Sequence, residues 1–509
     1  MQAPISQFAQ TVILRLALLG PALAIAVAAR GQTIPDAGAT AGFGSVNTPR
    51  PINPASDTTN PSARATQDLN PYLGSTPNGE VTKEELHLSL EDAIGRGLKY
   101  NLGLIDSQEA SSDARAQREH ALAALLPQIS ARAEQTYQQF SLKSINLAFP
   151  PQTGIHLPPT SGQYGYSEAR LTAQSPILSV ALLDRYRQQK EMETASALSA
   201  KDARDVVVFV VGSAYFQVVA SEARLETAQA ALASMRELHV QVADQFKSEI
   251  SPEIDTLRAT VELHTTEQRV TDAANDLEKD KLTLDRITGI PLGQAWTPAG
   301  DYDYVALASD AANDSHTAVG RFDIASAKAT LTAAEFRVRA ARSERLPEIS
   351  FNASYGGGGA NPASYNRVDE VIGSVSLPLF TSGRIRSDIH AAESDLVQRR
   401  AELADIEGRA DYDVRTARLD AQASESGVKV ADENRTLARR ALVQSQDRYK
   451  NGVTNYLEVL EAQEALVAAD ENYIASLFSF NVAKISLARA LGSAESRVPE
   501  FFSKSQPSH

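Results

Sequence analysis

The 509-residue sequence predicts a mainly α-helical fold in which each chain also contributes four strands to a membrane β-barrel. Three observations lead to this fold class. Two stretches of almost 70 residues, 180–247 and 384–450, contain no proline and have the composition of long coiled-coil helices. Short segments that alternate between apolar and polar residues precede each of these stretches. The whole order of elements occurs twice, which indicates an internal tandem duplication.

The duplication is visible in short motifs. LLPQIS at 125–130 recurs as RLPEIS at 345–350, 220 positions later. LDRITG at 284–289 recurs as LARALG at 487–492, 203 positions later. Because the shift falls from 220 to 203 between these two motifs, the first copy holds extra residues between them. We place these residues in an exposed loop around 142–162, because loops tolerate insertions.

The ends of the two copies define the expected domains. The division is 1–29, signal peptide; 30–87, disordered or extended N-terminal segment; 88–292, first repeat; 293–320, inter-repeat linker; 321–492, second repeat; 493–509, C-terminal tail. The apolar core of the signal peptide is too short to span a membrane. We expect no later stretch to approach a spanning helix, so a membrane must be crossed by β-strands.

Each repeat is expected to begin with an amphipathic helix and to continue into a β-hairpin. The alternating segments lie near 129–134 and 164–173 in the first copy and near 349–355 and 369–377 in the second. The prolines expected at the junctions between helices and barrel are Pro127, Pro176, Pro347 and Pro378. The run Gly356–Gly359 lies in the second hairpin and predicts a flexible turn, since it lacks the Lys-Ser/Thr of a phosphate loop.

After the hairpin, each repeat continues into a helix of about 68 residues, which makes a rod about 100 Å long. A brief turn then reverses the chain into a helix of about 35 residues that ends near Gly289 or Gly492. Heptad spacing on the first rod indicates coiled-coil packing. The seam residues are Leu225, Ala228, Leu232, Met235, His239, Val242 and Phe246. We interpret His239 as a histidine packed between helices.

The composition excludes several classes of function. The formal charge of −14, with no run of Lys and Arg, argues against a nucleic-acid partner because phosphate binding requires a basic face. The absence of cysteine excludes disulfides, zinc–thiolate sites, cysteine nucleophiles and a lipid-modified cysteine. The eight histidines show no metal-binding spacing. We therefore expect no cofactor, no metal site and no enzymatic activity.

Four strands cannot close a membrane barrel, because the smallest such barrels have about eight strands and an open edge in lipid leaves backbone groups unpaired. The sequence therefore predicts an oligomer. Three chains would supply twelve strands, and their rods would continue from the barrel as a cylinder.

The ordered, duplicated motifs resemble those of the TolC-like outer-membrane efflux and secretion channels. The resemblance covers about Leu88 to Leu491, and its sharpest part is YKNGVTNYLEVLEA at 449–462, which is similar to the family's R-Y-x-x-G-x-x-x-x-x-[DE]-V-L-x-A run. It implies a homotrimer with a twelve-stranded β-barrel in the outer membrane of a Gram-negative cell and a twelve-helix α-barrel in the periplasm. The implied function is the exit duct of a tripartite efflux pump or a type I secretion system.

The resemblance also implies partners. These are a periplasmic adaptor (membrane fusion) protein, an inner-membrane pump of the RND, ABC or MFS type, and outer-membrane lipid. The residues implied at the periplasmic tips and adaptor contact are Ser251, Pro252, Tyr449, Gly452, Val453 and Thr454. Some family members carry, in place of Thr454, an arginine that helps to lock the closed tip, so the lock of this chain must be weaker or differently built.

Acidic residues at the tips are candidates for the pore constriction. Glu458 and Glu461 share one helix face, and a threefold axis would turn each into a ring of carboxylates that favours cations. In the first repeat Asp255 matches Glu458, whereas Arg258 stands opposite Glu461. In the family, acids at the positions of Glu458 and Glu461 line the constriction. We therefore expect Asp255, Glu458 and Glu461 to line it here.

A periplasmic coiled-coil adaptor or structural protein is the alternative function. It would explain the rods and the acidic charge without a membrane. It does not explain two alternating hairpins at equivalent points in both copies.

Overall fold

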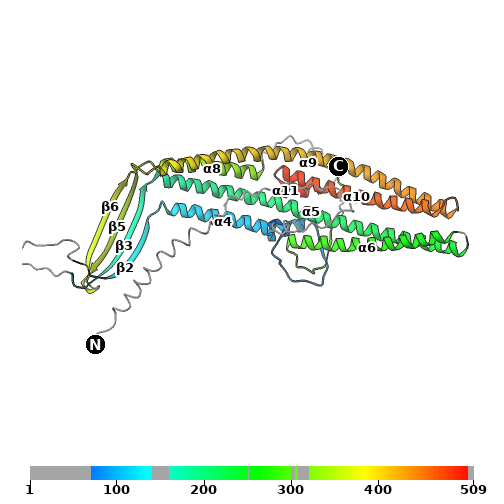
Figure 1. The fold of residues 1–509 in the computed structure, drawn as a ribbon, viewed down its shortest axis with the longest axis horizontal. Coiled ribbons are helices and arrows are strands. Elements are labelled where there is room, and N and C mark those ends of the chain that lie inside the picture. The colour runs from blue at the N-terminus through cyan, green and yellow to red at the C-terminus, as the bar shows by residue number, and fades with distance from the viewer. Residues whose placement is uncertain are drawn as a thin grey trace, which may run out of the picture. The chain divides into compact units, whose positions relative to one another are not determined.

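The computed structural model describes residues 70–139, 141, 160–249, 251–299, 304–307, 320–360 and 362–502. All of them belong to one compact unit, Arg64–His509. The expected signal peptide and most of the expected loop at 142–162 lie outside the described residues. In the described part, four strands lie at one end of a set of long helices (Figure 1).

Two antiparallel helical hairpins form the half of this unit that is remote from the strands. Helix α5 (Val180–Lys247) returns through α6 (Glu253–Thr288), and α9 (Arg384–Lys450) returns through α10 (Tyr456–Ala490). These bounds confirm the two predicted rods. Because α5 also contacts α10, the two hairpins lie side by side.

Shorter helices line the half nearer the strands. The second repeat has the single helix expected there, α8 (Phe322–Ser343), whereas the first repeat has two, α3 (Leu90–Tyr100) and α4 (Leu102–Ala123). Asn101 makes the break, because its backbone N–H donates to Gly97 O at the end of α3 and its side chain accepts from Gly103 N–H at the start of α4. Both α4 and α8 pack along α5.

The four strands form one antiparallel sheet. Its order is β2 (Gln128–Gln138), β3 (Tyr164–Leu178), β5 (Glu348–Gly359) and β6 (Asn366–Ser376). The two predicted hairpins are therefore joined through the β3–β5 pair, which has a bulge between Pro176 and Leu178. This leaves β2 and β6 as the two edges of the sheet within the described residues.

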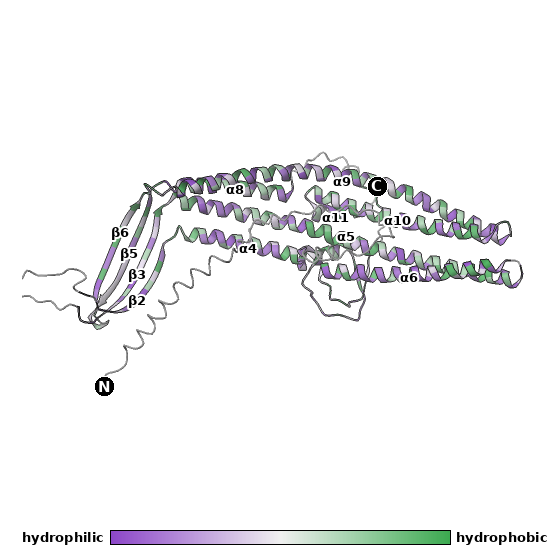
Figure 2. Cartoon of the chain, viewed as in Figure 1, coloured by the Kyte–Doolittle hydropathy of each residue, from purple (hydrophilic) through white to green (hydrophobic). Residues whose placement is uncertain are grey.

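The sheet has an apolar face and a polar face, and Figure 2 shows hydrophobic and hydrophilic residues along its strands. Ile129, Leu171, Tyr355 and Val371 fall on the same face by their pairing register, and all four side chains are exposed. An exposed apolar face that crosses every strand is typical of contact with lipid. The opposite face carries mainly polar side chains.

The glycine run Gly356–Gly359 lies within strand β5, so the predicted flexible turn is wrong. A Cβ atom at Gly356 would lie 2.8 Å from the Cα of Arg170 on the neighbouring strand. The glycines are thus required by a close approach between strands, which short-range sequence signals do not distinguish from a turn.

A core near the middle of the helices joins distant parts of the sequence. Strand β1 (Leu86–Leu88) pairs in parallel with β4 (Trp296–Pro298), which fixes the segment before the first repeat against the linker between the repeats. The hydroxyl of Tyr215 in α5 donates to Leu88 O at 2.9 Å. The last helix, α11 (Ala494–Phe502), packs on the same core through Val498.

One 18-residue stretch of α5 is apolar and long enough to cross a membrane, so the expectation that no such stretch follows the expected signal peptide is wrong. Val207, Val208, Val211 and Tyr215 in this helix are fully buried by other parts of the chain. Since 56% of the stretch is buried in this way, its hydrophobicity is accounted for by the core.

Candidate functional site at the tips of the helical hairpins

The turn between α9 and α10 is held by backbone hydrogen bonds. Gly452 has a left-handed φ of 71°, and its N–H donates to Tyr449 O at 3.0 Å. The N–H of Val453 donates to Arg448 O at 2.8 Å. This arrangement satisfies the last carbonyl groups of a helix. Asn455 then caps α10 by accepting a hydrogen bond from Glu458 N–H at 3.2 Å.

The equivalent turn between α5 and α6 is built without glycine. Glu249 has a left-handed φ of 58°, which is uncommon for a residue with a side chain. Pro252 occupies the N-cap of α6 and makes no side-chain capping bond. The N–H of Ser251 reaches Gln245 O at 3.4 Å. The two tips therefore occupy equivalent places in the repeats but differ in local chemistry.

The two hairpins share a core just behind their tips. Its buried members are Met235, Leu238, Val242, Ala259, Leu442, Tyr449, Tyr456 and Val459. The hydroxyl of Tyr449 donates to Gln245 Oε1 at 2.6 Å and so links α9 to α5. Burial, and then the charge of Glu262, raise the pKa of Tyr456 to about 12.

The acids expected at the constriction have different surroundings. Glu458 accepts a hydrogen bond from the Thr454 hydroxyl and lies 3.4 Å from Arg448 Nε. Its charge is therefore partly balanced inside its own hairpin. Glu461, one turn further along α10, is exposed and forms no ion pair within the described part of the chain.

Asp255 lies between the two hairpins. Its side chain is only 18% exposed and stands 3.8 Å from Arg258 of its own helix. After burial, the charge of Asp255 is the next cause that raises the pKa of Tyr449. The first-repeat acid is thus turned toward the core behind the tips, unlike Glu461.

The residues implied at the adaptor contact are divided between the surface and the core. Pro252, Gly452 and Val453 are exposed, and Val453 retains 67% of its accessible surface. Ser251 and Thr454 are half-buried, and Tyr449 is buried. The surface that these residues offer to a partner therefore consists mainly of the Gly452–Val453 turn and Pro252.

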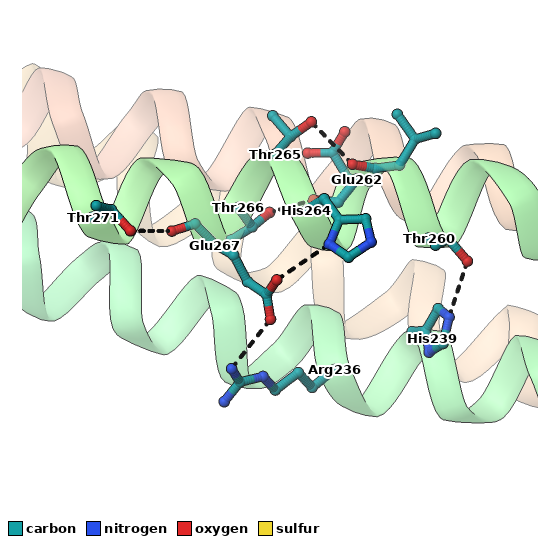
Figure 3. Close-up of polar contacts among 10 residues, drawn as sticks. Arg236, His239, Thr260, Glu262, His264, Thr265, Thr266, Glu267 and Thr271 are labelled. Carbon is teal, nitrogen blue, oxygen red and sulfur yellow. Dashed lines mark hydrogen bonds and ion pairs between the residues drawn. The ribbon is translucent and has the colours of Figure 1, made fainter.

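Polar contacts align α5 with α6 behind the first tip (Figure 3). His239 Nε2 lies 3.1 Å from Thr260 Oγ1, which confirms the interpretation of a histidine packed between helices. Arg236 and His264 both contact the carboxylate of Glu267, at 3.3 and 3.2 Å, and these contacts lower the pKa of Glu267. No group of His, Asp and Glu in the described ranges is placed to hold a metal ion.

A salt bridge that no sequence pattern predicts joins the two hairpins. Arg269 of α6 lies 3.1 Å from Glu464 of α10 and 3.8 Å from Glu262 of its own helix. Burial, and then the hydrogen bond and charge of Glu464, raise the pKa of Glu262. Heptad spacing places these residues on helices but does not identify which helices are neighbours, so no local signal predicts this contact.

The junction prolines lie where helices and strands meet. Pro127 and Pro347 stand immediately before β2 and β5, and Pro378 follows β6. Pro176 lies inside β3, next to its bulge. The bulge accounts for the tolerance of a proline, which cannot donate to a regular ladder.

Comparison with known proteins finds a family match in the second repeat. Residues 315–493 match the family model of the outer membrane efflux proteins. The chain is 23% identical over 322 residues to the cation efflux system protein CusC of Escherichia coli, an alignment that covers 60% of this chain and 69% of CusC. It is 25% identical over 320 residues to the toluene efflux pump outer membrane protein TtgF of Pseudomonas putida, which covers 58% of this chain and 63% of TtgF.

Solved structures show the same fold. A crystal structure of CusC superposes with a TM-score of 0.70 at 18% identity and covers 82% of this chain and 97% of that chain. The open-state structure of the MtrE outer membrane channel of Neisseria gonorrhoeae superposes with a TM-score of 0.68 at 19% identity and covers 83% and 97%. Residues 315–493 therefore carry an outer membrane efflux protein domain, and the chain as a whole has the fold of the solved outer-membrane efflux channels.

Proposed function

We propose that three copies of this chain form the outer-membrane exit duct of a tripartite efflux pump. The open four-stranded sheet carries this proposal. Its apolar face is exposed across every strand, and its two edges would leave backbone groups unpaired in lipid. Three sheets joined edge to edge give a closed barrel of twelve strands, and the helices then continue the barrel into the periplasm.

The tips are the natural contact for an adaptor protein. They lie at the end of the helices opposite the sheet, where the turn at Gly452–Val453 is exposed. An adaptor bound there would connect the duct to an inner-membrane pump of the RND, ABC or MFS type, which supplies the energy. The similar proteins are named for cations, toluene and pyoverdine, three unrelated cargoes, which supports a passive duct.

Within this duct, the acids of the tips would set the ion preference of the constriction. Glu461 is the strongest candidate, because it is exposed and forms no ion pair within the described residues. Glu458 forms an ion pair with Arg448 and accepts a hydrogen bond from the Thr454 hydroxyl. Asp255 faces the core between the hairpins. We therefore assign most of the cation preference to Glu461 and a smaller part to Glu458 and Asp255.

Recording from the purified protein in planar lipid bilayers tests both proposals. We expect single channels from particles whose native mass equals three chains, with a preference for cations and block by divalent cations. Glu461→Gln is expected to remove most of the preference, and adding Glu458→Gln to remove little more.

A matched control changes two exposed acids of α5 outside the tip, Glu226→Gln and Glu237→Gln, and should leave the preference unchanged. A monomeric particle that never conducts would contradict the duct. Unchanged selectivity and block in the tip variants would contradict only the assignment of the acids.

A further inference from the structure

On the polar face of the sheet, two successive cross-strand pairs of β2 and β3 each bring two like charges together, and we call each pair a row. Arg132 of β2 is directly paired with Arg170 of β3, and Glu134 is directly paired with Glu168. Residues two apart in a strand project from the same face, so all four side chains lie on one side of the sheet. This side is opposite to the apolar face that contains Leu171.

Facing like charges across two strands is unfavourable. The charges are balanced along the strands instead: Arg132 Nη2 lies 2.6 Å from Glu134 Oε2, and Arg170 forms an ion pair with Glu168. If Glu168 and Arg170 exchanged places, each cross-strand pair would join a positive and a negative side chain, and the composition of the sheet would not change. The sequence keeps the less stable order, and local conflicts of this kind are expected at functional positions.

The next strand leaves space for these rows. Gly356 is paired with Arg170, and Gly358 is paired with Glu168. A Cβ atom at Gly356 would lie 3.0 Å from Arg170 Cγ, and one at Gly358 would lie 2.9 Å from Tyr166 Cζ. The side chains of Arg170 and Tyr166 therefore lean over the glycines. Glycine at these two positions thus lets the side chains of Arg170 and Tyr166 lie close to the sheet.

We propose that these rows form two stacked rings of opposite charge inside the barrel, which act as an electrostatic filter for small ions and charged cargo. The inference rests on the proposed trimer, in which each ring receives two residues from each of three chains. The rows are two residues apart, or about 7 Å. The arginine row lies nearer the helices and the glutamate row nearer the far end of the strands, so outgoing cargo meets the arginine ring first.

The physical effect of each ring is to favour ions of the opposite sign. In the native protein the two contributions oppose each other. Removing one ring leaves the other unbalanced, so loss of the arginines must increase the preference for cations, and loss of the glutamates must decrease it. A purely structural role for these residues predicts no such opposite pair of shifts.

The test is the reversal potential of single channels in a potassium chloride gradient. For Arg132→Gln with Arg170→Gln we expect the permeability ratio to move severalfold toward cations. For Glu134→Gln with Glu168→Gln we expect it to move severalfold toward anions. Arg367→Gln and Asp369→Asn serve as controls that change the charge in the same direction by one unit per chain instead of two. Both residues lie on the opposite face of the sheet, so neither substitution should cause a shift.

A charge exchange, Glu168→Arg with Arg170→Glu, tests the segregation of charge without changing the net charge. It creates opposite-charge pairs across the strands, so we expect a higher unfolding temperature together with the loss of any current rectification in symmetric salt. The filter is overturned if conducting trimers of both double variants keep the native permeability ratio. An unaltered protein that does not conduct would instead overturn the proposed duct.

Discussion

Replacing Asp202 by asparagine is expected to stabilise the protein at neutral pH. Asp202 is a partly buried residue of α5, and burial, followed by the charge of Asp323, raises its pKa from 3.8 to about 6. The folded state therefore holds the proton more tightly than the unfolded chain does. The stability associated with this group is complete below about pH 4 and is lost as the pH rises through about 6.

The size of the effect follows from the shift. About two pKa units correspond to roughly 3 kcal/mol per chain, and the partial exposure of Asp202 makes this an upper bound. Asparagine does not ionise, so the variant should avoid the loss. Thermal unfolding in detergent should show a higher midpoint for Asp202→Asn than for the native protein at about pH 7.5, and a smaller difference at about pH 4.5.

An exposed aspartate of α4 provides the control for this experiment. Asp113→Asn removes the same charge from the helix surface and should leave the midpoint at both pH values nearly unchanged. An Asp202→Asn protein that is no more stable than the native protein at neutral pH would show that the charge of Asp202 is accommodated without cost.

Alanine in place of Gly289 or Gly492 is expected to destabilise the protein by about 3 kcal/mol. These glycines occupy equivalent positions at the ends of α6 and α10, with left-handed φ angles of 71° and 75°. A Cβ atom at Gly289 would lie 2.7 Å from Thr76 O, and one at Gly492 would lie 2.8 Å from Arg321 Cα. Each substitution therefore combines backbone strain with a collision against backbone atoms.

Gly452 separates these two causes. Its φ is also 71°, but no atom lies within 4 Å of the position that a Cβ would occupy. Gly452→Ala should therefore cost only the strain, about 1 kcal/mol. The midpoints of thermal unfolding should fall clearly further for Gly289→Ala and Gly492→Ala than for Gly452→Ala. Equal losses at all three positions would contradict the close contacts at the helix ends.

The long helices were predictable because local chemistry sets their ends. Ser179 caps α5 by accepting from Leu182 N–H, and Asn455 caps α10 in the same way through Glu458 N–H. No proline interrupts either rod, and the left-handed glycines stop the returning helices. The strands were predictable from their alternation, and the repeat located their equivalents in the second copy.

Contacts between distant segments were not predictable. Neither alternation nor spacing shows that β3 pairs with β5, or that β1 pairs with β4 across more than 200 residues. Lys484 is a further example, since it is fully buried in α10, donates to Val305 O at 3.1 Å and lies 4.3 Å from the Phe502 ring. Burial lowers its pKa to about 8. In the sequence, this lysine looks like any surface residue of a helix.

At the candidate site, the positions of the acids near the tips were predictable from the sequence, whereas the residues that contact them were not. Glu458 and Glu461 lie on the predicted helix, but the contacts of Glu458 with Arg448 and Thr454 depend on the geometry of the turn. The orientation of Asp255 toward Tyr449 depends on how the two hairpins pack. Repeat equivalence therefore predicted matching positions, while packing decides which of them face solvent.

Single-cysteine labelling is the most direct test of the central claim that the sheet spans the outer membrane and the helices extend into the periplasm. The chain has no native cysteine, so a cysteine at Thr160, Val371 or Lys450 is a unique target. With a membrane-impermeant maleimide, we expect labelling at Thr160 on intact cells, labelling at Lys450 only after the outer membrane is permeabilised, and protection of Val371 by lipid in both cases. Labelling of Lys450 on intact cells, or protection of Thr160 until the membrane is opened, would contradict the account.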